Sequence, residues 1–176
     1  MLFSFGLLIC LVAPGQLSAD DWPQWLGPQR DSVWRETGIV DSFPEDGPPQ
    51  LWRQKVGYGY AGPSVAQGRV FVADFLTNEE IPYPRAGRRD RLRGTERILC
   101  LAADDGRILW KHEHPCTYNI SYPYGPRVTP TVDGDRVYTL GAEGRLLCLQ
   151  ASDGSEIWSR ELTEKYDCDT PQWGFA

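Results

Sequence analysis

The sequence predicts an all-β chain that forms part of a β-propeller: two four-stranded antiparallel blades plus flanking strands, from a ring of roughly seven or eight blades. The first observation is a repeat. Residues 146–158 have an earlier copy at 98–110, in which seven of thirteen positions are identical. Each copy is an apolar run, an Asp-Gly turn and a second run that ends in Trp, which is the pattern of a β-hairpin.

The second observation is a matching pair of segments upstream of each copy. Residues 63–72 align with 130–139, and each segment is a short run, a Gly-containing turn and a β-branched, aromatic run. Two hairpins per period give four strands. The period of 48 residues that separates Cys100 from Cys148 is that of one propeller blade.

Composition is the third observation. The 176 residues include 14 Pro, 18 Gly, 7 Trp, 8 Tyr and 6 Phe, with no long charged block, which is typical of a turn-rich all-β protein. The net charge of −6 argues against a nucleic-acid partner, because such a partner needs a basic face.

The N-terminus predicts export. Residues 1–19 contain no charged side chain and are largely apolar, so we expect a signal peptide that is cleaved near Ala19 and a periplasmic or extracellular protein. A lipid-attachment site at Cys10 is the alternative. No later stretch approaches the roughly 18 apolar residues that a transmembrane span needs.

Residues 20–50 read as an extended N-terminal segment rich in Pro and Gly. Trp22, Trp25 and Trp34 are expected to anchor it to the propeller, and a sugar-stacking platform is the alternative. Residues 51–56 match the last strand of each blade. In a closed ring, an N-terminal strand of this kind completes the final blade, so we interpret 51–56 as a closing strand.

The first blade is predicted at 57–114 and carries an insertion at 75–97. Val70 and Ile98 are 28 residues apart, whereas the equivalent Val137 and Leu146 are separated by 9. Five arginines against one aspartate give 85–93 a charge of +4. The segment is therefore either a solvated, mobile loop or a site for an anion or a partner, since arginine favours carboxylate and phosphate.

The second blade is predicted at 115–162, with a long aromatic connection at its start, and residues 163–176 resemble the beginning of another blade. Two blades cannot close a ring, so we expect the sequence to be a fragment of a longer chain. Strand direction alternates within a blade, which places the 75–97 insertion and the 115–127 connection at one end. Long loops on a rigid scaffold usually carry binding. The candidate ligand or partner face consists of Arg85, Arg88, Arg89, Tyr122, Tyr124 and Arg127.

Little catalytic chemistry is visible. His112 and His114 alternate on one predicted strand and could share a face, as metal ligands do, but we expect surface histidines and no metal site. Cys100 and Cys148 are expected to be buried thiols, because equivalent points in neighbouring blades lie beyond bridging distance. A disulfide between Cys116 and Cys168 remains open. No catalytic residue is identified.

The repeat resembles that of the pyrroloquinoline-quinone (PQQ)-type propeller proteins, whose blades end in a tryptophan-docking motif, roughly Ala-x-Asp-x-x-x-Gly-x-x-x-Trp. Gly106 with Trp110 and Gly154 with Trp158 match its spacing, whereas Cys and Ala or Gln stand at the Ala and Asp positions. Residues 21–28 also resemble the start of secreted bacterial propellers of this group. The resemblance implies a blade-docking role for Trp52, Trp110, Trp158, Gly106 and Gly154.

Two classes of function follow from the resemblance. The first is an exported, non-catalytic binding or assembly scaffold for a protein, peptide or glycan, like the outer-membrane assembly lipoprotein with the same repeat. The second is an alcohol or sugar dehydrogenase that holds PQQ and calcium in its central funnel. We favour the scaffold, because the motif docks blades together and therefore reports fold, not chemistry. No adjacent Cys-Cys pair or calcium ligand set is identifiable in the sequence.

Overall fold

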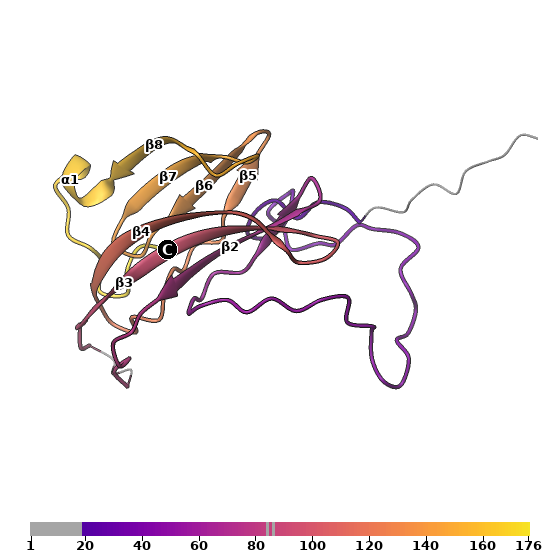
Figure 1. Cartoon of the computed structure of the whole chain (residues 1–176), viewed down its shortest axis with the longest axis horizontal. Coiled ribbons are helices and arrows are strands. Elements are labelled where there is room, and N and C mark those ends of the chain that lie inside the picture. The colour runs from indigo at the N-terminus through magenta and orange to yellow at the C-terminus, as the bar shows by residue number, and fades with distance from the viewer. Residues whose placement is uncertain (1–18, 84, 86) are drawn as a thin grey trace, which may run out of the picture.

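The structure is a computed structural model that describes residues 19–83, 85 and 87–176 (Figure 1). The predicted signal peptide lies outside these residues except for Ala19. The described chain forms two sheets that lie one over the other, with the N-terminal segment extending away from them (Figure 1).

Each sheet has four antiparallel strands in sequence order, as the propeller prediction requires. The first blade consists of β1 (Ser64–Ala66), β2 (Arg69–Leu76), β3 (Asp90–Ala102) and β4 (Ile108–Ile120). The second blade consists of β5 (Thr131–Asp133), β6 (Arg136–Leu140), β7 (Arg145–Gln150) and β8 (Glu156–Glu161). The fold class predicted from the repeat is therefore confirmed.

The turn residues explain where the strands reverse. Gln67 and Gly68 both have positive φ, 52° and 70°, which is the requirement of the two-residue turn that suits a hairpin. Both blades also shift register at the same point, directly after Cys100 and directly after Cys148. The sequence repeat therefore reproduces the register shift as well as the strand pairing in both blades.

The main core lies between the two sheets. Inner-face residues of the first blade, such as Phe71 and Ile98, pack with inner-face residues of the second, such as Val137 and Leu147. Cys100 and Cys148 are fully buried free thiols, as predicted. Burial raises the pKa of Cys100 to about 11, so this thiol stays protonated and inert.

Three segments differ from the prediction. Only part of the insertion at 75–97 is a loop, because β2 runs to Leu76 and β3 begins at Asp90. Residues 51–56 form no strand, because no strand pairs with them in the described part of the chain. Residues 163–176, which we interpreted as the start of another blade, form turns and most of a short helix, α1 (Leu162–Tyr166).

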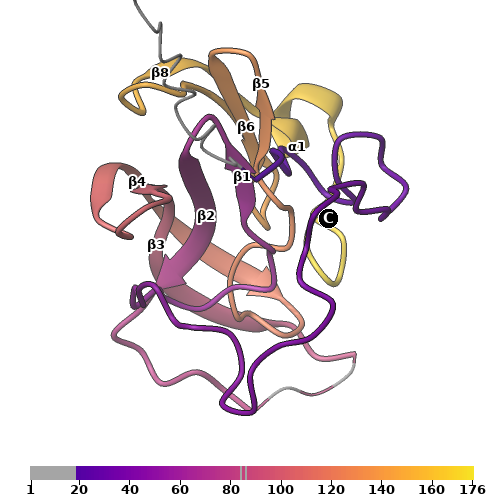
Figure 2. The ribbon, with the colours of Figure 1, turned by 90° about the vertical axis from the view of Figure 1, so that its right-hand side faces the viewer.

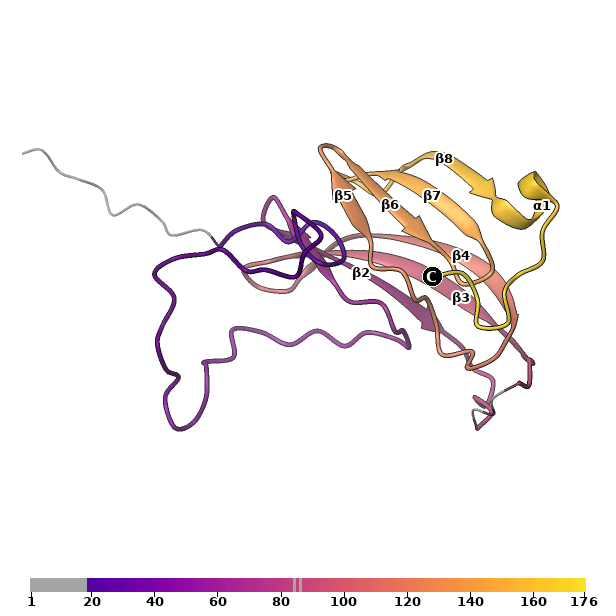
Figure 3. The same cartoon turned by 180° about the vertical axis from the view of Figure 1, so that it is seen from behind.

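The start of the N-terminal segment is bonded to both blades, because the carbonyl oxygen of Pro23 accepts from the backbone N–H of Val132 in β5 over 2.8 Å. Trp22 exchanges two backbone hydrogen bonds with Val65 of β1, and its indole lies against Gly27. Trp25 and Trp34 are 66% and 60% exposed, so the anchor role predicted for them is wrong. Beyond residue 28 the segment makes a wide excursion before it returns to the sheets (Figures 2 and 3). None of the described residues forms a helix with the length and apolar character that crossing a membrane requires.

Candidate functional site

The two long loops meet at one end of the blades. The Ser121 hydroxyl donates a hydrogen bond to the carbonyl oxygen of Arg88 over 2.6 Å, and the Tyr124 hydroxyl donates to that of Pro82 over 3.3 Å. The backbone N–H of Ser121 also donates to the carbonyl oxygen of Gln172 over 2.7 Å. We define the loop face as residues 58–60, 77–83, 85, 87–89, 119–127 and 170–176.

Aromatic rings gather on the loop face. The rings of Tyr122 and Trp173 stack with centroids 5.0 Å apart and an interplanar angle of 25°. Tyr124 lies between Tyr58 and Tyr60, with centroids 6.4 Å and 6.3 Å away. Tyr58, Tyr60 and Trp173 are each about half exposed, so the cluster is a surface and not a core.

Arg127 organises the loop that carries this cluster. Its guanidinium donates to the carbonyl oxygens of Ser121 and Tyr122 over 3.2 Å and 2.7 Å, and also to that of Gly125. The same group lies 5.2 Å from the centroid of the Tyr60 ring, within cation–π range. Burial lowers the pKa of Arg127 from that of a solvated guanidinium, although arginine keeps its charge at neutral pH.

An open hollow lies on this surface, with a volume of about 370 Å³. It is lined by Tyr60, Tyr122, Arg127, Trp173 and Ala176, and its exposed lining is almost entirely apolar. Tyr122 has a φ of 55°, a left-handed conformation that is uncommon for a bulky residue. Conformations of this kind concentrate at functional sites because the surrounding structure has to enforce them.

The candidate arginines take different roles. Arg88 forms an ion pair with Asp90, with Nε and Oδ1 2.7 Å apart. Arg89 donates to the carbonyl oxygens of Asn119 and Thr170 over 3.0 Å and 2.8 Å, which ties the first blade to the C-terminal segment. Arg85 is exposed on the same loop.

The structure therefore brings Tyr122, Tyr124 and Arg127 together, with Arg88 and Arg89 beside them. Their role in binding stays a prediction. Sequence reasoning missed Tyr58, Tyr60 and Trp173, which complete the aromatic cluster. The alternation of Tyr and Gly at 57–60 was the available signal, since a ring can pass close over a residue that has no side chain.

A second polar cluster is buried between the blades. Glu96 of β3 is 3% exposed and accepts hydrogen bonds from the Tyr118 hydroxyl over 2.6 Å and from the backbone N–H of Ala142 over 3.0 Å. Its other oxygen lies 3.2 Å from Nε2 of His114. Burial by itself raises the pKa of Glu96, but the bonds from His114, Tyr118 and Ala142 outweigh burial and hold the pKa below its usual value.

The histidines depart from the prediction. His114 is only 8% exposed, because the inner face of β4 packs on the second blade, and its Nδ1 has no hydrogen-bond partner. His112 is partly buried, and burial lowers its pKa. The prediction of two surface histidines is therefore wrong. Among the residues that the structure describes, no group of three His, Cys, Asp or Glu side chains could hold a metal ion.

Cys116 is next to the buried cluster on the same face of β4, and burial, followed by the charge of Glu96, raises its pKa far above that of an ordinary thiol. It is a free thiol, and so is the exposed Cys168. The pairing of these two cysteines, which the sequence left open, is absent from the structure. A thiol in this environment is a poor nucleophile, because the thiolate is the reactive form.

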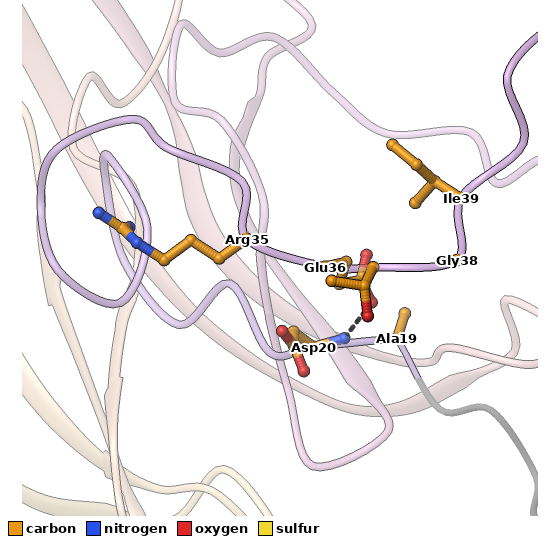
Figure 4. Close-up of a pocket in the computed structure, with 7 residues that line it drawn as sticks. Ala19, Asp20, Arg35, Glu36, Gly38 and Ile39 are labelled. Carbon is orange, nitrogen blue, oxygen red and sulfur yellow. Dashed lines mark hydrogen bonds between the residues drawn. The ribbon is translucent and has the colours of Figure 1, made fainter.

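Another hollow lies in the N-terminal segment, lined by residues that include Asp20, Arg35 and Glu36 (Figure 4). The backbone N–H of Asp20 donates to Glu36 Oε1 over 2.5 Å. A hydrogen bond and ion pair from Arg35 lower the pKa of Asp31 to about 2. Arg35 is thus engaged by Asp31, and Glu36 by the backbone of Asp20, so neither side chain is left to act on a ligand.

Two of the three tryptophans assigned to blade docking, Trp52 and Trp110, dock in the same way. The Nε1–H of Trp52 donates to the carbonyl oxygen of Ala103 over 2.8 Å, and its ring lies over Gly106. The Nε1–H of Trp110 donates to the carbonyl oxygen of Ala151 over 3.0 Å, and the ring of Trp110 lies over Gly154. Trp158 is only partly buried and lies against Arg160 and Tyr138.

Two comparisons with known proteins found similarity. The family model described as outer membrane protein assembly factor BamB matches residues 94–171, which cover β3, β4 and the second blade. No curated protein matches the sequence. The crystal structure of BamB from Moraxella catarrhalis aligns at 15% identity with a TM-score of 0.30, over 70% of this chain and 38% of that chain. The chain thus spans about two fifths of the length of that structure. Residues 94–171 carry the PQQ-like β-propeller repeat that the BamB family model describes.

Proposed function

We propose that this protein is an exported, non-catalytic β-propeller scaffold that binds a protein partner on its loop face. One observation carries the proposal: an exposed cluster of five aromatic rings, arranged by Arg127, lies where the two long loops meet. Tyrosine, tryptophan and arginine are the residues that most often dominate protein interfaces.

Two further observations support the proposal. The matching family model bears the name of an assembly factor, which is a role performed by contact between proteins. Two polar side chains of this chain are also used for structure: the buried Glu96 joins the blades, and the exposed Arg89 ties down the C-terminal segment. Export is part of the proposal because residues 1–19 have the pattern of a signal peptide.

Site-specific crosslinking in the native host tests the proposal. A photoreactive residue in place of Tyr60 or Trp173 is expected to capture a protein in the exported fraction. The matched control is the same residue in place of Trp25, which is more exposed than Tyr60 or Trp173 and lies on the N-terminal segment. A partner captured equally well from position 25, or chain that retains Met1 in the cytoplasm, would contradict the proposal.

The quinone-dependent dehydrogenase is tested separately. Purified protein is mixed with PQQ and calcium, and binding is followed by calorimetry while dye reduction is followed with alcohols and sugars. The scaffold proposal expects no turnover that depends on both additions. Turnover that needs both PQQ and calcium would replace the scaffold with the enzyme.

A further inference from the structure

The loop face is positively charged on a protein with a net charge of −6. The residues of this face include four arginines, at positions 85, 88, 89 and 127, and two glutamates, Glu79 and Glu80, which leaves a charge of +2. Glu143 adds one carboxylate at the edge, where it accepts the backbone N–H of Asn119. Asp90 adds a second carboxylate at the edge and pairs with Arg88, whereas Glu79 pairs with Arg93 outside the face.

The structural bonds do not neutralise two of these arginines. Arg89 and Arg127 donate to carbonyl oxygens and not to carboxylates. Glu96 and Glu143 act on Arg127 electrostatically, but its hydrogen bonds go to backbone carbonyl oxygens. Arg88 keeps 56% of its side chain exposed although it pairs with Asp90, so it still presents donors to a second carboxylate.

The apolar hollow adjoins these charges. The Ser121 hydroxyl makes two hydrogen bonds. It donates to the carbonyl oxygen of Arg88 and accepts from Nε2 of Gln172 over 3.4 Å. Tyr122 and Trp173, which line the hollow, are the next residues in the chain after these two contacts. Ser121 therefore places the backbone of Arg88 next to the segment that carries the stacked rings.

The lining of the hollow favours a side chain over a sugar. A sugar ring needs donors and acceptors for its hydroxyl groups, and the nearest strong donor, Arg127, already donates to three carbonyl oxygens of its own loop. A large apolar side chain needs only the faces of the rings, and such contacts are the usual anchors of protein interfaces.

We propose that the loop face binds an acidic protein segment that inserts an aromatic or aliphatic side chain between Tyr60, Tyr122 and Trp173 and places carboxylates on Arg85 and Arg88. This inference rests on the proposed scaffold function and adds the chemistry of its partner. Charge complementarity is the reason to choose an acidic segment: arginine at an exposed rim pairs with carboxylate and raises the association rate.

The test is selection from a displayed library of random peptides on the full immobilised chain. The expected result is enrichment of peptides that combine Asp or Glu with Trp, Phe, Tyr or Leu. Trp173→Ala is expected to weaken a selected peptide by about tenfold or more, because a central aromatic anchor contributes on that scale. Arg88→Gln is expected to weaken it several-fold and to reduce its salt dependence, which screening of charge produces.

Controls separate binding from folding. Trp173→Phe keeps an aromatic ring and should retain most of the binding if the variant is folded, as judged by circular dichroism. Trp25→Ala and Arg107→Gln change exposed residues outside the loop face and should leave binding unchanged. Basic or neutral selected peptides, or binding that survives Trp173→Ala, would overturn the inference.

Two other outcomes are also decisive. Binding of an anionic polysaccharide or of anionic phospholipid vesicles to the same face, without peptide binding, would overturn the acidic segment. If crosslinking from position 60 or 173 still captures a protein while acidic peptides fail, the scaffold function stands and the partner chemistry proposed here falls. If crosslinking captures no protein although acidic peptides bind, the binding chemistry of the face stands and the scaffold function in the native host falls.

Discussion

The Nε1–H of Trp110 donates a hydrogen bond to the carbonyl oxygen of Ala151 over 3.0 Å, and this bond joins the outer strand of the first blade to the second blade. The pairing repeats within the chain. Phe71 packs on Trp110 with centroids 5.9 Å apart, and Tyr138 packs on Trp158 with centroids 6.1 Å apart, so each blade presents its Trp from the same aromatic pair. Trp52, outside either blade, docks on the first blade as Trp110 docks on the second.

Replacing Trp110 by Ala is expected to lower the free energy of unfolding by about 3–5 kcal/mol, because it removes a large buried ring and leaves a cavity. Urea denaturation followed by fluorescence measures this change. Trp25→Ala is the matched control, since Trp25 is 66% exposed, and it should have little effect. Equal losses for the two variants would contradict the docking role of Trp110.

Gly154, the glycine of the docking motif in the second blade, makes docking of Trp110 possible. A Cβ added at Gly154 would lie 2.7 Å from Cδ2 of Trp110, and φ at this residue is 74°. Gly154→Ala is therefore expected to cost more than the ~1 kcal/mol of backbone strain alone. Gly134→Ala isolates that strain, because Gly134 has φ of 58° with nothing within 4 Å of its added Cβ. Thermal unfolding of both variants gives the comparison, and an equal shift in Tm would exclude steric contact with Trp110.

Glu96 predicts a dependence of stability on pH. Its pKa in the folded chain is below that of the unfolded chain, so the carboxylate stabilises the fold above the unfolded value, about 4.3, and this contribution is lost as pH falls through the folded value. Glu96→Gln is expected to lose about 2 kcal/mol at neutral pH, because hydrogen bonds to a charged group contribute on that scale. The variant should also lose less stability on acidification than the natural protein, as measured by urea unfolding from pH 7 to pH 3. Parallel pH profiles would show that Glu96 is not the group responsible.

The ion pair between Asp74 and Arg97 is almost completely buried. Asp74 is 1% exposed, its carboxylate accepts two bonds from the Arg97 guanidinium over 2.8 Å and 2.6 Å, and the bond raises the pKa of Arg97. Arg97→Met is expected to lose about 3–5 kcal/mol of unfolding free energy, because it leaves an uncompensated buried charge. The matched change Arg107→Met, in an exposed pair with Asp105, should give a change close to experimental error. The Asp74→Asn, Arg97→Met double variant should be less destabilised than the sum of the two single variants.

The sequence by itself determined the blades and their turns. Residues 98–110 and 146–158 repeat because each forms the same hairpin, and the Asp-Gly turns and terminal Trp keep their spacing. It also predicted that Cys100 and Cys148 are buried and that the two long loops lie at one end. These properties follow from local patterns: alternation along a strand, turn residues and the reversal of direction at each turn.

Only the tertiary structure decided which polar residues are buried and which aromatic residues meet. Glu96 and His114 look like surface residues in the sequence, but the second blade covers the inner face of β4 and encloses them. Tyr60, Tyr122 and Trp173 belong to three separate segments, and the contacts of Ser121 and Arg127 bring them together. Residues 51–56 have the sequence of a strand yet remain unpaired, because a strand depends on hydrogen bonds from a neighbour, and that neighbour cannot be read from the strand itself.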